Sequence, residues 1–241
     1  LATTSADGTV RLWNTSSWDR TQTLYGHAGW VLQSAFSPDG TMLLTAGTDK
    51  TIRLWDVTTG EEKKLFKNPL PEGLVDGIWF TSDHIALFTL NFETVDQCKN
   101  CQSRSFLLDT NTGIYSEQPW PWLNVFEGQN GLWLLKYGNY PDYRISIGTM
   151  LEGQFQVENE FALTSITNSD KIAISPDGQW IYTLNLNGIN LINRFNGEQV
   201  GLVANNLCRE CSNLGSIIVD PGGSFLLDNS MGSLVVWGVS E

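Results

Sequence analysis

Four cysteines and two histidines are the residues of this chain whose types and spacing could do chemistry. The cysteines form two Cys-x-x-Cys pairs, Cys98 with Cys101 and Cys208 with Cys211. Two such pairs are typical of a four-thiolate zinc site, but each pair can also close a local disulfide or remain as two free thiols. The sequence leaves these three interpretations open. No cofactor is the first expectation, and zinc is the alternative.

Catalytic patterns are not found elsewhere in the sequence. No His-Glu-x-x-His, Gly-x-Ser-x-Gly, phosphate-cradling loop or Gly-x-Gly-x-x-Gly motif occurs. His84 follows Ser82 and Asp83 in a predicted hairpin turn, where a solvated polar residue is expected. The sequence therefore predicts a chain that is not an enzyme.

The composition narrows the range of partners. The 241 residues carry a net charge of −12, and such an acidic surface repels nucleic-acid phosphates and anionic membranes. No apolar run approaches the roughly 18 residues of a membrane-spanning helix. Ten Trp, six Tyr, eleven Phe and 23 Gly indicate short strands joined by tight turns. We therefore expect a protein or peptide partner, with no nucleic acid and no membrane insertion.

A repeat with a period in the forties organises the chain. One apolar strand recurs at positions separated by 44, 46, 48 and 45 residues, which are Phe36, Phe80, Phe126, Ile174 and Val219. Each copy ends in Pro-Asp-Gly or a variant, and two further apolar runs and a weaker fourth one follow it. Four short antiparallel strands per repeat are typical of a β-propeller blade, so the sequence predicts an all-β β-propeller fold.

The phrases "ADGTVRLWN" (6–14) and "TDKTIRLWD" (48–56) make the resemblance specific. Residues 26–56, from Gly-His to Trp-Asp, resemble a complete unit of the WD40-repeat family, and the opening residues resemble the second half of another. The resemblance implies a structural hydrogen-bonded set of His27, Thr45, Asp49 and Trp55. In the first, truncated repeat it implies Thr3, Asp7 and Trp13 at the equivalent positions. Later units lack the full set, so apolar packing must hold them together.

Six repeat units are visible, approximately 1–25, 26–66, 67–118, 119–160, 161–203 and 204–241. We expect a single propeller domain. The chain opens on the second strand of a unit and ends on a third, so we expect the C-terminal part of a longer protein whose upstream strands complete the ring. A seven-bladed ring would need roughly 60–70 further residues. The alternative is a six-bladed ring closed by about 20 residues.

Aromatic residues gather on loops that we expect to share one rim of the propeller. This candidate binding rim consists of Trp30, Trp120, Trp122, Tyr137, Tyr140 and Tyr143. Trp and Tyr on presented loops are typical of protein-binding surfaces, although side chains of this kind can also fill gaps between blades. The resemblance implies a non-catalytic module that binds a protein or peptide, or acts as a scaffold, as the sensing or recruiting part of a larger protein.

The alternative function is a propeller that binds a small molecule in its central channel, or an enzyme built around that channel. It would require polar side chains that converge at the start of the innermost strands. The candidates there are Gln33, Asp76 and Lys171, which form no recognisable set in the sequence.

Each interpretation of the four cysteines predicts a different thiol count. Two local disulfides leave no thiol to react without reductant and four with it, and they would indicate an oxidising compartment. Free thiols give four under both conditions without bound metal, which agrees with the cytoplasm. A shared site gives four thiols and one zinc ion per chain. Thiol titration of the denatured protein with and without reductant, beside a zinc assay, separates the three.

Overall fold

The computed structural model describes residues 1–92, 103–118, 122–127, 132–137, 143–151, 154–163, 171–175, 177–185, 188–202, 217–219, 225–230 and 233–238. All regular elements in these residues are β-strands, which confirms the predicted all-β fold. The chain divides into two compact units, and each is described by itself below. The first comprises Leu1–Leu123 with Leu151–Gln154, and the second comprises Asn124–Met150 with Phe155–Glu241.

Three antiparallel sheets make up the first unit. The first sheet contains β1 (Ala2–Thr4), β2 (Val10–Trp13) and β3 (Arg20–Leu24). The second contains β4 (Val31–Phe36), β5 (Met42–Gly47), β6 (Thr51–Asp56) and β7 (Glu62–Lys67). The third contains β8 (Leu74–Phe80), β9 (Ile85–Asn91), β10 (Arg104–Asp109) and β11 (Tyr115–Gln118).

The second unit contains three further sheets, apart from a few strand-end residues of the fourth. The fourth sheet contains β12 (Trp122–Glu127), β13 (Leu132–Tyr137), β14 (Tyr143–Leu151) and β15 (Gln154–Leu163). The fifth contains β16 (Lys171–Ile174), β17 (Trp180–Asn185), β18 (Gly188–Asn193) and β19 (Gln199–Leu202). The sixth contains β20 (Ile217–Val219), β21 (Phe225–Ser230) and β22 (Ser233–Gly238).

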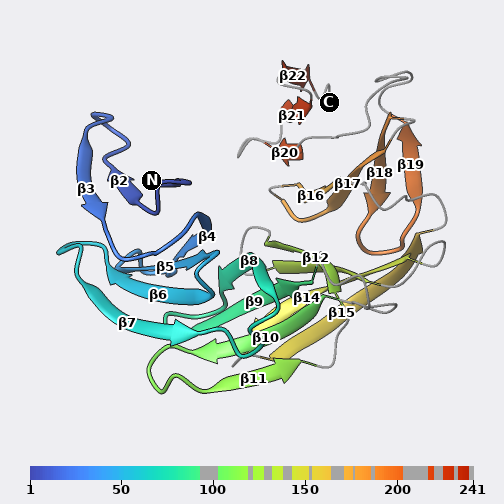
Figure 1. Ribbon diagram of the computed structural model, residues 1–241. Coiled ribbons are helices and arrows are strands. Elements are labelled where there is room, and N and C mark those ends of the chain that lie inside the picture. The colour runs from blue at the N-terminus through green and yellow to red at the C-terminus, as the bar shows by residue number, and fades with distance from the viewer. Residues whose placement is uncertain are drawn as a thin grey trace. The chain divides into compact units, whose positions relative to one another are not determined.

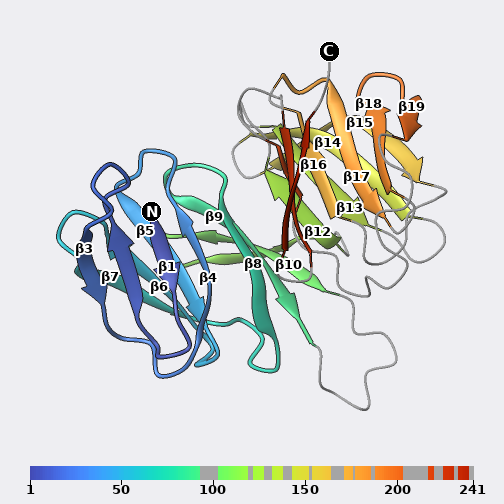
Figure 2. The same ribbon diagram turned by 90° about the horizontal axis from the view of Figure 1, so that it is seen from above.

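Every sheet is a meander in which sequence neighbours pair antiparallel (Figure 1). In the second sheet, for example, Phe36 lies opposite Leu43, and Leu43 lies opposite Trp55. Within the first unit, β4 contacts both β1 and β8, and Figure 2 shows β1 to β3 beside the strands of the second sheet. Four-stranded antiparallel sheets in series are the predicted arrangement of propeller blades.

Glycine in the left-handed region forms the tight turn between the first and second strands. Gly40 ends the Ser37-Pro-Asp-Gly turn at a φ of 71°, and its amide donates to the Ser37 carbonyl at 2.8 Å. Gly178 repeats this geometry in the fifth sheet, with a φ of 71° and a 2.8 Å bond to Ser175 O. The Pro-Asp-Gly signal in the sequence thus predicted these turns correctly.

A second type of turn joins the third and fourth strands. Its fifth residue donates its amide to the carbonyl of the first, as from Gly60 to Asp56 at 2.8 Å. Gly113 and Gly197 occupy the same position at φ values of 78° and 70°. In the three-stranded first sheet, β2 and β3 correspond to the third and fourth strands of the other sheets. The residue at this turn position is Trp18, which has a φ of 60° and is 66% exposed. A bulky residue rarely adopts that conformation, so the first turn carries backbone strain that the others avoid.

The core lies between adjacent sheets. Middle strands are therefore buried on both faces, as Leu43, Leu44 and Ala46 of β5 and Phe88 of β9 are, with exposures of 1% or less. In the first unit, one cluster joins the first and second sheets and a larger one joins the second and third. Each fully buried large aliphatic side chain contributes roughly 1.5–3 kcal/mol to stability.

Polar side chains on fourth strands bind the turn of the next sheet. In the first unit, the Gln22 amide of β3 donates to Thr58 O at 2.6 Å and to Val57 O at 3.4 Å. Lys64 of β7 donates from Nζ to Thr110 O at 3.0 Å and to Asn111 O. These two pairs of carbonyls occupy equivalent positions in their turns. We call this contact the turn clamp.

The second unit contains a third turn clamp. Asn159 of β15 donates from Nδ2 to Arg194 O at 3.1 Å and to Phe195 O at 3.0 Å. Two residues after each donor stands an apolar residue. Leu24 and Phe66 belong to core clusters, and Phe161 packs against one. The turn glycine gives this strand room, because a Cβ on Gly197 would lie 2.5 Å from the Phe161 ring.

Two glycine substitutions test the turn clamp. A Cβ at residue 60 would lie 1.8 Å from Gln22 Oε1, whereas a Cβ at residue 40 would meet nothing within 4 Å. Both glycines have positive φ, so the backbone cost of alanine is the same at both sites. We expect Gly60→Ala to lower the free energy of unfolding by about 1 kcal/mol more than Gly40→Ala, because Gln22 must leave its carbonyls.

Chemical denaturation measures this difference. On a Gln22→Ala background, the two alanine variants should differ by only a few tenths of a kcal/mol. Equal losses from both substitutions in the unaltered chain would show that the clamp does not contribute to stability.

Candidate functional site

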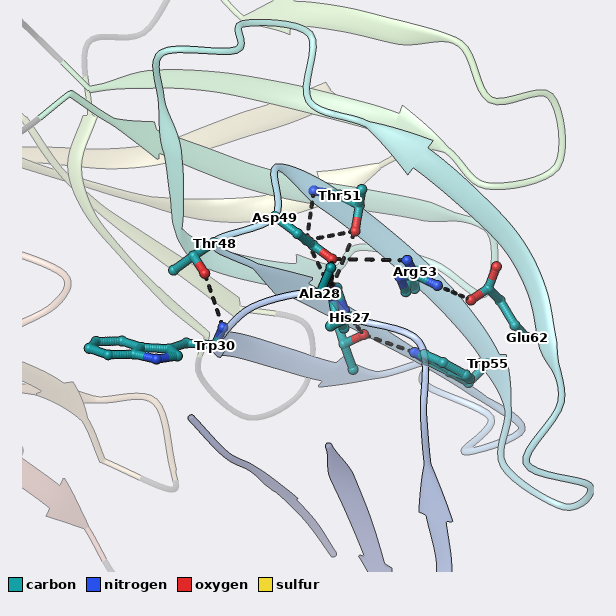
Figure 3. Close-up of polar contacts among 10 residues, drawn as sticks. His27, Ala28, Trp30, Thr48, Asp49, Thr51, Arg53, Trp55 and Glu62 are labelled. Atoms are coloured by element: carbon teal, nitrogen blue, oxygen red, sulfur yellow. Dashed lines mark hydrogen bonds and ion pairs between the residues drawn. The ribbon is translucent and has the colours of Figure 1, made fainter. Parts of the chain in front are cut away.

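A buried polar chain crosses the second sheet. Trp55, near the end of β6, is 2% exposed, and its indole Nε1 donates to Thr45 Oγ1 of β5 at 2.8 Å. The hydroxyl of Thr45 is fully buried and lies 2.8 Å from His27 Nε2. His27 Nδ1 in turn lies 3.0 Å from Asp49 Oδ2 (Figure 3). The four side chains thus form one continuous hydrogen-bonded chain.

The direction of these bonds fixes the tautomer of His27. Indole can only donate, so Thr45 accepts from Trp55 and gives its own proton to His27 Nε2. His27 therefore carries its proton on Nδ1 and donates it to the carboxylate of Asp49. The polar groups of these four side chains then all have partners, which removes the cost of burying them.

Asp49 is the acceptor at the end of this chain. Burial by itself raises the pKa of Asp49, but several hydrogen bonds outweigh that effect and hold the pKa below its ordinary value. The donors are the Ala28 amide at 2.9 Å, the Thr51 hydroxyl at 2.8 Å and His27. Asp49 therefore stays ionised and ties the loop before β4 to the turn before β6.

His27 is held neutral. Its side chain is fully enclosed, and burial lowers its pKa below the ordinary value of 6.5. The hydrogen bond to Asp49 and the Asp49 charge act in the opposite direction but do not outweigh burial. Arg53 adds a cation on the outer side, where its Nη2 lies 3.9 Å from Asp49 and its Nη1 pairs with Glu62. An enclosed, fully bonded imidazole is a structural group.

The first sheet contains a shorter version of this hydrogen-bonded set of side chains. Trp13 Nε1 donates to Thr3 Oγ1 at 2.9 Å. Asp7 accepts from the Thr9 amide at 2.9 Å, from the Thr9 hydroxyl and from Arg11 Nη2 at 2.7 Å. The Thr9 hydroxyl bond, followed by the Arg11 bond, places the pKa of Asp7 far below its ordinary value.

The third and fifth sheets replace the tryptophan with aliphatic residues, whereas Trp237 of the sixth sheet stands at the same position as Trp55. Leu108 and Ile192 stand at the position of Trp55 and are buried. In the third sheet Phe88 stands at the position of Thr45, and the next residue, Thr89, donates its hydroxyl to Asp76. In the fifth sheet Thr183 stands at the position of Thr45, and its buried hydroxyl has no partner among the described residues. The Thr89–Asp76 bond was missed at the sequence level, because Thr89 lies one residue out of the register of Thr45.

Of the candidate binding rim, the structure describes the side chain of Trp30 only. Trp30 is 60% exposed and directly precedes β4. Its amide donates to Thr48 Oγ1 at 3.0 Å, and the Thr48 amide donates to Trp30 O at 2.8 Å. Figure 3 shows the indole ring of Trp30 pointing away from the buried polar chain. The backbone of Trp30 is thus fixed while its ring is presented.

The other rim residues are only partly covered or not covered at all. Trp122, Tyr137 and Tyr143 lie in β12, β13 and β14, and their side chains are outside the described part. Trp120 and Tyr140 lie outside the described residues altogether.

The same holds for Cys98, Cys101, Cys208 and Cys211, so the three interpretations of the cysteines remain predictions. The described residues contain no group of three or more His, Cys, Asp or Glu side chains arranged to hold a metal ion. In that same part of the chain, no helix is long and apolar enough to cross a membrane.

Repeated four-stranded sheets with a Trp–Thr–His–Asp chain define a repeat protein of the propeller class. The family model described as "WD domain, G-beta repeat" matches residues 1–14 and 17–56. These are the residues that form the first sheet and the first three strands of the second. The first quarter of the chain therefore carries recognisable WD40 repeats, and the chain is similar to the WD40-repeat family over these residues.

Named proteins with similar sequences agree with this result. The chain is 31% identical over 129 residues to "p21-activated protein kinase-interacting protein 1-like" of Xenopus laevis, covering 49% of this chain and 36% of that protein. It is 38% identical over 68 residues to "Lissencephaly-1 homolog 1" of Paramecium tetraurelia, covering 28% of this chain and 17% of that protein.

A third similar protein is human "Apoptotic protease-activating factor 1". It is 48% identical over 59 residues, which are 24% of this chain and 4% of that protein. The chain thus matches about a third or less of the length of these relatives.

The enclosed state of His27 predicts a pH dependence of stability. Its pKa is lower in the folded chain than in the unfolded chain, so the unfolded chain binds more protons in mild acid. The contribution of His27 to stability is complete above about pH 6.5 and is lost as the pH falls towards the lower folded pKa. We expect the free energy of unfolding to decrease from pH 7.5 to pH 5.

Urea denaturation across this pH range measures the effect. His27→Gln should remove this part of the pH dependence, whereas His84→Gln, the matched change outside the buried polar chain, should keep it. A pH dependence that is unchanged in His27→Gln would refute the assignment.

Proposed function

We propose that this chain is a non-catalytic module that binds a protein or peptide partner through the surface around Trp30. The single observation that carries the proposal is the presentation of Trp30, a large exposed ring on a backbone that four hydrogen bonds restrain. Those bonds run from Ala28 to Asp49, in both directions between Trp30 and Thr48, and from Val31 to Ser5.

Rigid presentation favours binding for a physical reason. A loop that is already ordered loses little conformational entropy when a partner associates with it. Tryptophan is also among the residues that most often dominate binding energy at protein interfaces. Thr48 and Asp49, which restrain the loop, belong to the turn before β6. The sheet itself therefore supports the proposed surface.

The names of the relatives support the class of partner. One is called a kinase-interacting protein, and "DDB1- and CUL4-associated factor 13" of Dictyostelium discoideum, which is 38% identical over 61 residues, is named for its association with other proteins. His27 supports the non-catalytic assignment, because an enclosed imidazole with both nitrogens bonded is not available to a substrate.

A displayed peptide library provides the test. Peptides selected on the unaltered chain should bind Trp30→Ala at least about tenfold more weakly, because the main apolar contact is removed. Trp18→Ala is the matched control, since Trp18 is similarly exposed at 66% but lies on the turn between β2 and β3. Its affinity should not change.

Melting temperatures of both variants should stay close to that of the unaltered chain, because neither ring is buried. Equal affinity of Trp30→Ala and the unaltered chain for every selected peptide would contradict the role of this surface.

A further inference from the structure

A cavity of about 310 Å³ lies in the first unit, where β4 and β8 are neighbours. Gln33 of β4 and Asp76 of β8 both line it, together with Leu32, Glu72 and Leu74. Gln33 and Asp76 are 43 residues apart and belong to different sheets, so the fold brings them together. The volume is at the lower end of the range for ligand pockets, which is suited to one long side chain.

The lining of the cavity combines apolar and acidic side chains. Leu32 and Leu74 supply apolar surface, and Leu32 is 36% exposed. Glu72 and Asp76 are both exposed and supply two carboxylates. The hydroxyl of Thr89 donates to Asp76 and orients it. No ion pair within the described residues involves Glu72, so this carboxylate is open to an incoming cation.

Lys50 also lines the cavity, but its charge is directed to the backbone. Its Nζ donates to Gly73 O at 3.1 Å, and the Asn68 amide donates to the same carbonyl at 3.1 Å. Two carboxylates outnumber this one ammonium, so the lining remains net negative. A carboxylate or phosphate ligand would meet repulsion from Glu72 and Asp76.

We propose that this cavity binds an arginine or lysine side chain of the peptide partner. The inference rests on the proposed function and adds the chemistry of the residue recognised. The aliphatic stem of such a side chain packs against Leu32 and Leu74, and its cationic end reaches Glu72 and Asp76 in charge-assisted hydrogen bonds. The net charge of −12 also attracts cationic peptides towards the chain.

Peptide selection on matched chains tests the proposal. A random displayed library is selected in parallel on the unaltered chain, on Glu72→Gln and on Glu61→Gln. Glu61 is 71% exposed in the turn between β6 and β7, so its variant loses the same charge away from the cavity. We expect arginine or lysine to be enriched at one fixed position by the unaltered chain and by Glu61→Gln, and not by Glu72→Gln.

The affinity of one selected peptide then locates the contact. It should bind Glu72→Gln about tenfold more weakly than the unaltered chain, and a glutamine in place of the basic peptide residue should cost about the same. The two changes together should cost no more than either alone, because they remove one shared interaction. Additive losses, or equal affinity for Glu72→Gln, would overturn the cavity as the site.

The selection also separates this inference from the proposed function. Peptides that bind specifically but lack a fixed basic residue would overturn the inference and leave the proposed function supported. A library that yields no specific peptide on the unaltered chain would overturn both. Asp76→Asn serves as the second variant, and the melting temperature of each variant establishes that it is folded.

Discussion

The turn clamp is the contact on which the series of sheets depends. The carbonyls of a turn between two strands have no partner in their own sheet, and leaving them without donors has a cost when a neighbour packs over them. Gln22, Lys64 and Asn159 solve this problem with three different side chains at one structural position. The apolar residue two positions later then enters the core between the sheets. Hydrogen bonding and apolar packing are thus set by one short stretch of each fourth strand.

This arrangement explains why the repeats can diverge after the second sheet. The buried chain that ends on Trp55 lies within one sheet, so it stabilises that sheet and not its junction with the next. Leu108 and Ile192 can replace Trp55 because the position needs only an apolar side chain once no indole requires an acceptor. With no indole to serve, the position of Thr45 is taken by Phe88 in the third sheet. The third and fifth sheets thus keep the clamped turn without the tryptophan.

The fold was predictable because its signals are local. Pro-Asp-Gly marks a tight turn, and short strands that follow one another between such turns favour a meander. The turn clamps were not predictable, since donor and acceptor are 35 to 47 residues apart and the donor can be Gln, Lys or Asn. The cavity was missed for the same reason. Gln33 and Asp76 could be identified as polar residues on first strands, but their meeting depends on how β4 packs against β8.

Stability and proposed binding share one group of residues in the second sheet. Asp49 accepts from His27 inside the sheet and from Ala28 in the loop that carries Trp30. A change at Asp49 would therefore loosen the loop as well as the buried chain, and weaker binding by such a variant would not identify a contact residue. Trp30 and Glu72 do not take part in the buried chain. Substitutions at these two positions can consequently report on binding while the sheet remains intact.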